Sequence, residues 1–92
     1  MTHPNTLSDD EVLEAIDEAL AAGDRDTLQG GIAVATLAHR LAYSPSTIRQ
    51  HCRRLAATGE IVRVAGADPA TGQPRPSFLP SDHPDASRSS HL

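Results

Sequence analysis

The sequence predicts a mainly α domain, with three helices followed by a small β-hairpin. Three local signals carry this prediction. Ser8-Asp9-Asp10-Glu11 has the Ser-x-x-Glu spacing of a helix capping box, and Ser44-Pro45 places an N-cap residue before a proline at the first helical position. Gly59 then stops the chain before a run of β-branched residues. At 92 residues, the chain has the size of a single domain.

The first helix is predicted over about residues 8–22. Its apolar residues recur at helical spacing, while Asp and Glu occupy the other side. Leu7 and Val12 have the spacing of a hydrophobic staple around the Ser8 cap, and Gly23 supplies the stop. Residues 1–7 are expected to form a flexible N-terminus.

The middle of the chain predicts two shorter helices. Residues 24–31 read as a loop that ends in Gly30-Gly31, and residues 32–34 as a very short strand. A helix over about residues 35–42 follows, then a turn, then a helix over about residues 45–58. In that last helix the spacing i, i+4, i+7 places three apolar residues inward: Ile48, Cys52 and Leu55.

The hairpin is predicted from residues 60–79. Residues 60–65 form its first strand, the Gly- and Pro-rich stretch 66–76 its loop, and residues 77–79 its return strand. From Pro80 onward the chain is rich in Ser, Pro, Asp and His, so residues 80–92 are expected to be a disordered tail. The folded domain would then span residues 8–79.

The net charge of −4 conceals two halves of opposite sign. Residues 1–26 contain eight acidic residues against Arg25. Residues 27–79 contain six arginines against Glu60 and Asp68. The half that holds the second and third helices is therefore basic, a pattern found in proteins that bind nucleic acid.

Residues 37–59 carry the most specific pattern: Leu37-Ala38-(x)2-Leu41-(x)2-Ser44-Pro45-Ser46-Thr47-Ile48-Arg49-Gln50-His51-(x)2-Arg54-Leu55-(x)3-Gly59. Together with Gly72-Gln73-Pro74-Arg75 before Phe78, it resembles the winged helix-turn-helix of prokaryotic transcriptional regulators of the MarR and ArsR type. The resemblance covers about residues 8–79. It implies a three-helix core with a two-stranded wing and sequence-specific binding of double-stranded DNA, with helix 45–58 in the major groove and wing 60–79 on the backbone or minor groove.

Helical geometry gives roles within this pattern. Ser46, Gln50 and Arg53 lie opposite the inward stripe, where Gln50 can address an adenine edge and Arg53 a guanine edge. Flanking positions suit phosphates, as do the backbone N–H groups at the helix start. The full set of predicted DNA contacts is Ser44, Ser46, Thr47, Arg49, Gln50, Arg53, Arg54, Arg63 and Arg75.

The sequence gives little indication of disulfide formation, of catalysis, or of a site for a metal, cofactor or small-molecule ligand. Cys52 lies on the inward face and is interpreted as a small buried hydrophobe, and a single cysteine forms no internal disulfide. His51, at the edge of that face, is expected to be packed or hydrogen-bonded. No nucleophile–base–orienter set is evident, so we expect no enzyme activity, no metal, no cofactor and no small-molecule ligand.

The expected partners are double-stranded DNA and a second copy of the chain, as in a small homodimeric repressor that reads two half-sites. No apolar run is long enough to span a membrane, and the acidic N-terminus lacks signal-peptide features, so a cytoplasmic location is expected. The alternative is a winged-helix protein-interaction module, in which the acidic first helix is the contact surface and no DNA is bound.

Overall fold

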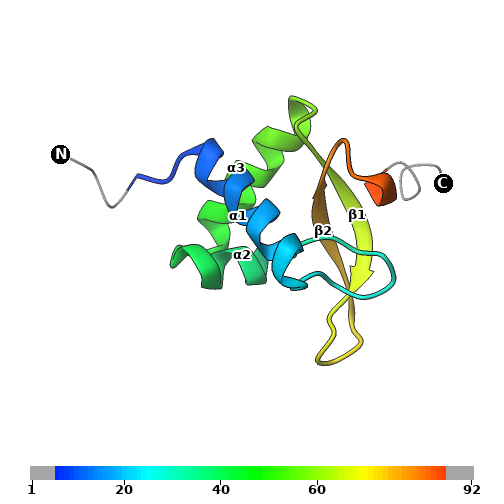
Figure 1. Ribbon diagram of the computed structural model, residues 1–92. Coiled ribbons are helices and arrows are strands. Elements are labelled where there is room, and N and C mark those ends of the chain that lie inside the picture. Colours follow the sequence, from blue (N-terminus) through cyan, green and yellow to red (C-terminus); the bar gives the residue numbers. More distant parts are fainter. Residues whose placement is uncertain (1–5, 87–92) are drawn as a thin grey trace.

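The computed structural model describes residues 6–86, in which three helices precede an antiparallel hairpin. The elements in order are α1 (Asp9–Ala22), α2 (Val34–Leu41), α3 (Pro45–Ala57), β1 (Ile61–Ala67) and β2 (Pro74–Pro80). The helices lie on one side of the hairpin, and a single helical turn at residues 84–86 lies on the other (Figure 1). The chain is thus a small α+β protein whose elements follow the predicted order. Within residues 6–86, no helix has the length and apolarity needed to span a membrane.

The start of α1 is fixed by the predicted capping box. The Glu11 amide donates to Ser8 Oγ at 3.2 Å, and the Ser8 amide donates to Glu11 Oε1 at 2.9 Å. Gly23 ends the helix in the left-handed region at a φ of 82°. Leu7 is buried in the same core as Val12, so the prediction of a flexible segment is wrong for Leu7. Residues 1–5 lie outside the described part of the chain.

The segment that contains α2 and α3 also follows its local signals. Ser44 caps α3 by accepting a hydrogen bond from the Thr47 amide at 3.3 Å, and Pro45 occupies the first helical position. The inward stripe of Ile48, Cys52 and Leu55 is buried, as predicted. α2 is shifted by one residue from its predicted range and ends where Ala42 adopts a left-handed conformation.

The predicted strand at residues 32–34 is reduced to one bridging residue. Ile32 exchanges two backbone hydrogen bonds with Phe78, at 2.8 and 2.9 Å, and Val34 already belongs to α2. This bridge joins the residues before α2 to the outer edge of β2. The helices and the hairpin therefore share one core, which also contains Leu37 and Ile61.

The hairpin is longer than predicted, and the predicted loop over residues 66–76 is wrong. β1 pairs with β2 from Ile61↔Pro80 to Ala67↔Pro74, which leaves only residues 68–73 as the loop. The prolines of β2 fit the strand because they all lie at alternate positions whose backbone nitrogens face away from β1. The Phe78 amide points away from β1 toward Ile32, and Pro74, Pro76 and Pro80 share that orientation. Their missing N–H groups therefore cost no bond to β1.

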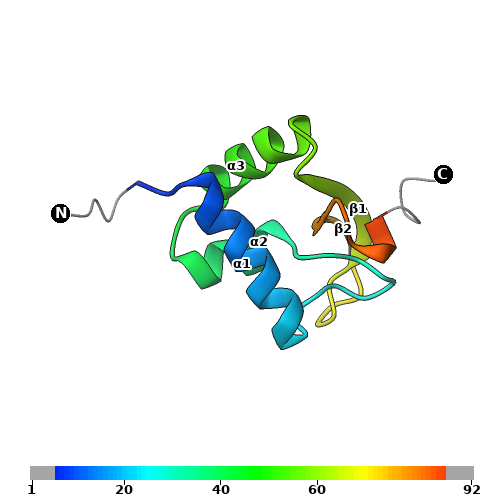
Figure 2. The same ribbon diagram turned by 45° about the horizontal axis from the view of Figure 1, so that its top comes forward.

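The loop after α1 crosses one face of the hairpin, from the edge of β1 to the edge of β2 (Figure 2). Thr27 bridges Ala67 at the first edge, as Ile32 bridges Phe78 at the second. Between them, Gly30 lies so close to Gly66 that a Cβ on Gly30 would stand 2.9 Å from the Gly66 Cα. Two glycines at this crossing allow the backbones to touch.

The segment after β2 is packed onto the hairpin, so the predicted disorder is wrong for residues 80–86. Pro80 pairs with Ile61, and Ala86 is buried against Val64 and Leu79. Asp85 forms an ion pair with Arg25 at 2.9 Å. Composition predicted disorder because this stretch has almost nothing to bury, yet one alanine and one ion pair dock its helical turn. Residues 87–92 lie outside the described part of the chain.

Candidate nucleic-acid interface

The exposed face of α3 carries most of the predicted DNA contacts. Ser46, Gln50 and Arg53 are exposed on the side opposite the buried stripe, as helical geometry predicts. Thr47 is half-buried on one flank. The hydroxyl of Ser44 is already used as the helix cap, and it also lies 3.0 Å from the Thr47 hydroxyl. The hydroxyl of Ser46 and the amide of Gln50, in contrast, have no hydrogen-bond partner among the described residues.

Three arginines from two elements line one hollow beside this face. Arg49 and Arg53 come from α3, Arg63 comes from β1, and the hollow has a volume of about 330 Å³. Its apolar lining consists of Val34, Ala56, Pro76 and Phe78. None of the three arginines has a hydrogen bond or ion pair to another residue within the described range 6–86. All three side chains are exposed to solvent around the same hollow.

The remaining arginines of residues 6–86 are each paired with a carboxylate. Arg25 pairs with Asp85, Arg40 with Asp24, Arg54 with Asp9 and Arg75 with Asp26, at distances of 2.7–2.9 Å. This division separates arginines that stabilise the fold from arginines available to a ligand. The available ones gather at the junction of α3 and the hairpin.

Arg54 is the first of two predicted DNA contacts whose side chains pair with a carboxylate of the protein itself. Its guanidinium forms two hydrogen bonds to the Asp9 carboxylate, from Nε at 3.1 Å and from Nη2 at 2.9 Å. The His51 ring nitrogen Nδ1 lies 2.6 Å from Asp9 Oδ1, which confirms the prediction that His51 is hydrogen-bonded. The hydrogen bonds from Arg54 and His51 lower the pKa of Asp9 from 3.8 to about 2. Arg54 thus ties α3 to the start of α1.

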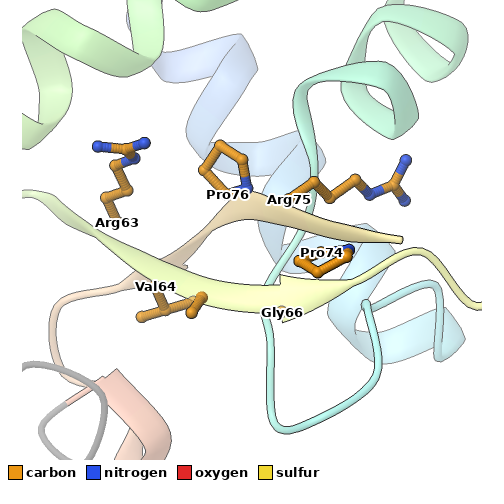
Figure 3. A pocket seen from close by; sticks show the side chains of 7 residues that line it. Arg63, Val64, Gly66, Pro74, Arg75 and Pro76 are labelled. Atoms are coloured by element: carbon orange, nitrogen blue, oxygen red, sulfur yellow. The ribbon is translucent and has the colours of Figure 1, made fainter. Parts of the chain in front are cut away.

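Arg75 is the second predicted DNA contact whose side chain pairs with a carboxylate of the protein itself. Its guanidinium holds both oxygens of Asp26, from Nε at 2.8 Å and from Nη2 at 2.7 Å, and its Nη1 lies 3.4 Å from Asp68. The hydrogen bond to Asp26 raises the pKa of Arg75 above its ordinary value. Arg63 and Arg75 extend from opposite ends of a shallow hollow on the hairpin, with Pro76 between them (Figure 3). Arg75 is thus held by an acidic residue of the protein itself, and its contact with DNA stays a prediction.

Cys52 is buried in the core, and burial raises the pKa of its thiol to about 11. This agrees with its interpretation as a small hydrophobe. Among the described residues, no group of three or more His, Cys, Asp and Glu side chains is arranged to hold a metal ion.

Sequence reasoning missed the acidic partners of Arg54 and Arg75, and the apolar lining of the hollow. Asp9 reads as part of a capping box and Asp26 as a loop acid, and neither carries a sequence signal for an arginine 45 or 49 residues away. Pairing over such separations is decided by the path of the chain. A comparison of this chain with protein-family models, with curated protein sequences and with solved structures found no match.

Proposed function

We propose that this protein binds double-stranded DNA and acts as a small transcriptional regulator of the winged helix-turn-helix kind. One observation carries the proposal. Three arginines that have no ion-pair partner among residues 6–86 line one hollow at the junction of α3 and β1, next to the exposed face of α3. Unpaired arginines gathered at one place suit a polyanion, since each neutralised phosphate releases condensed counterions.

In the proposed complex, α3 enters the major groove with Ser46 and Gln50 foremost. Gln50 reads base edges, and the small Ser46 allows close approach. The location of Arg53 in the hollow groups it with Arg49 and Arg63, and all three contact phosphates where the backbone passes between α3 and the hairpin. This assignment differs from the sequence-based one, in which Arg53 reads a guanine.

Salt dependence provides the first test. If each of these three arginines neutralises one phosphate, together they contribute about −2.7 per copy to the slope of the logarithm of the association constant against the logarithm of salt concentration. Fluorescence anisotropy with a labelled mixed-sequence duplex, from 50 to 200 mM salt, measures this slope. Arg49→Gln, Arg53→Gln and Arg63→Gln each reduce its magnitude by about 0.9. Arg40→Gln, which removes an arginine paired with Asp24, is the charge-matched control and leaves the slope unchanged.

Base reading is tested separately, with duplexes selected from genomic fragments. Gln50→Ala costs about 1–3 kcal/mol on the preferred duplex, relaxes the preference at one base position and leaves the salt slope unchanged. Preserved preference in Gln50→Ala would show that α3 does not dock as proposed. A flat salt dependence in the unaltered protein would contradict DNA binding itself.

The alternative function, a protein-interaction module, is favoured by the outer face of α1. This face exposes four carboxylates, none of which has an ion-pair partner within residues 6–86: Asp10, Glu14, Asp17 and Glu18. Like charges at i, i+4 destabilise a helix by about 0.2–0.5 kcal/mol per pair. A basic protein surface would relieve that repulsion. Failure to bind any duplex at low salt would favour this function.

The proposed regulator is a homodimer, which matches two-fold half-sites. Among the described residues, Leu28 is the one exposed large apolar side chain, at 78% exposure. A dimer formed by residues 6–86 would therefore bury a mainly polar surface. Sedimentation equilibrium with and without the duplex measures the stoichiometry, and a single copy bound to each site would contradict the dimer.

A further inference from the structure

The contact between the start of α1 and one flank of α3 bears on how tightly α3 could hold DNA. Asp9 is the first residue of α1, and its carboxylate accepts two hydrogen bonds from Arg54 and one from His51. Arg54 follows Gln50 by four residues, so both side chains leave α3 on neighbouring lines of its surface. At 56% exposure, the Arg54 side chain lies at the edge of the face that we assign to DNA.

A carboxylate and a phosphate bind a guanidinium group with the same hydrogen-bonding geometry. Both accept two parallel N–H bonds in a fork, so Asp9 fills the position at Arg54 that a phosphate would fill. The hydrogen bonds keep the pKa of Asp9 near 2, and its carboxylate is therefore ionised throughout the neutral range. The internal anion is always present in the folded protein.

We propose that Asp9 is an internal competitor for DNA, which occupies Arg54 and so lowers the affinity of α3 for phosphate. This inference rests on the proposed function and concerns the regulation of the same surface. It gives a role to the pairing of Arg54 with a carboxylate, which Arg49, Arg53 and Arg63 lack among residues 6–86.

His51 makes it feasible for Arg54 to release Asp9 and bind a DNA phosphate in its place. Its side chain is only 12% exposed, and its Nδ1 holds Asp9 Oδ1 at 2.6 Å. When Arg54 binds a phosphate, the Asp9 carboxylate keeps its hydrogen bond to His51 and is not left without a partner. The exchange then breaks one partly exposed ion pair, and pairs of that kind shift an equilibrium by roughly two- to fivefold.

The test compares Asp9→Asn with Asp10→Asn. Both substitutions remove one negative charge from the first turn of α1, but the hydrogen bonds and the ion pair of Arg54 go to Asp9 and His51 and none goes to Asp10. On the labelled mixed-sequence duplex, Asp9→Asn should bind roughly two- to fivefold more tightly than Asp10→Asn at 50 mM salt. Its salt slope should equal that of Asp10→Asn, because Arg54 neutralises the same phosphate in both variants once it has left residue 9. The double variant Asp9→Asn/Arg54→Gln should lose the gain in affinity.

The outcomes separate this inference from the proposed function. If the unaltered protein binds DNA and Asp9→Asn behaves like Asp10→Asn, the inference falls and the function stands. Tight binding by the Asp9→Asn/Arg54→Gln variant would also overturn it. If neither the unaltered protein nor Asp9→Asn binds DNA, both ideas fail.

A second measurement avoids substitution altogether. In the ¹⁵N-labelled protein, the Nε–Hε resonance of Arg54 reports which anion the guanidinium holds. Excess duplex should shift it, because a phosphate replaces the Asp9 carboxylate. A resonance that stays unchanged at saturation would overturn the inference, even if Asp9→Asn proved too unstable to study.

Discussion

The pair Arg75–Asp26 allows a quantitative test of the structural role assigned to Arg75. The Asp26 side chain is 1% exposed, and both of its carboxylate oxygens accept hydrogen bonds from Arg75. The change Arg75→Met keeps a long apolar stem and removes the charge, which leaves Asp26 buried without its cation. Breaking a buried ion pair by removing one partner costs about 3–5 kcal/mol. We expect a value near 3, because Arg75 is 26% exposed and water reaches its side of the pair.

That cost is large for a chain of this size. At roughly 0.05–0.15 kcal/mol per residue, its free energy of unfolding is about 5–14 kcal/mol. Urea unfolding followed by circular dichroism should show the midpoint falling by roughly 2 M, since the m-value of a small domain is about 1–1.5 kcal/mol per molar urea. The m-value itself should not change.

Arg63→Met is the matched control for this prediction. Arg63 lies on the same hairpin, is exposed and has no ion pair to another described residue, so its replacement should change stability by less than about 0.5 kcal/mol. If Arg75→Met lost less than about 1 kcal/mol, the pair would be no stronger than a surface ion pair. If the folded Arg75→Met protein instead lost DNA affinity, as we expect of Arg53→Gln, Arg75 would be a DNA contact after all.

Three further predictions concern other parts of the fold. The pKa of Asp9 is lower in the folded protein than its ordinary 3.8, so the stability that its carboxylate contributes is complete above about pH 5 and is lost as the pH falls toward 2. When the free energy of unfolding is measured against pH, Asp9→Asn should therefore lose about 1 kcal/mol less than the unaltered protein, after allowance for solvent screening of this partly exposed side chain. Gly31→Ala should destabilise the protein by about 1–3 kcal/mol in urea, because a Cβ there would collide with the Phe78 carbonyl, and unchanged stability would contradict the loop crossing. With a thiol pKa of about 11, Cys52 should react with a disulfide reagent at pH 8 only in urea, and rapid reaction of the folded protein would show that it is not buried.

The helices were predictable because their signals are local. Ser8 with Glu11, and Ser44 with Pro45, satisfy backbone groups within three residues, so the ends of α1 and α3 follow from neighbours in sequence. The exposed face of α3 follows in the same way from helical periodicity. These features needed no knowledge of the rest of the chain.

The hairpin was predicted in place but not in extent. Pro74 and Pro76 indicated a loop, since proline normally interrupts a strand. Whether a proline interrupts pairing depends on which edge its nitrogen faces, and register with β1 and the bridge from Ile32 decide that. Neither can be read from residues 74–80 alone.

The sequence by itself determined the helices, the order of the elements and the face of α3 that meets solvent, because each depends on interactions over a few residues. Only the tertiary structure decided which arginines are available. Arg49, Arg53 and Arg63 line one hollow and have no ion-pair partner in the described part of the chain, while Arg54 and Arg75 are held by Asp9 and Asp26 from distant parts of the sequence. The physical reason is that a side-chain ion pair forms only within about 4 Å. The path of the folded backbone, and no property of an arginine in its own sequence neighbourhood, sets that distance.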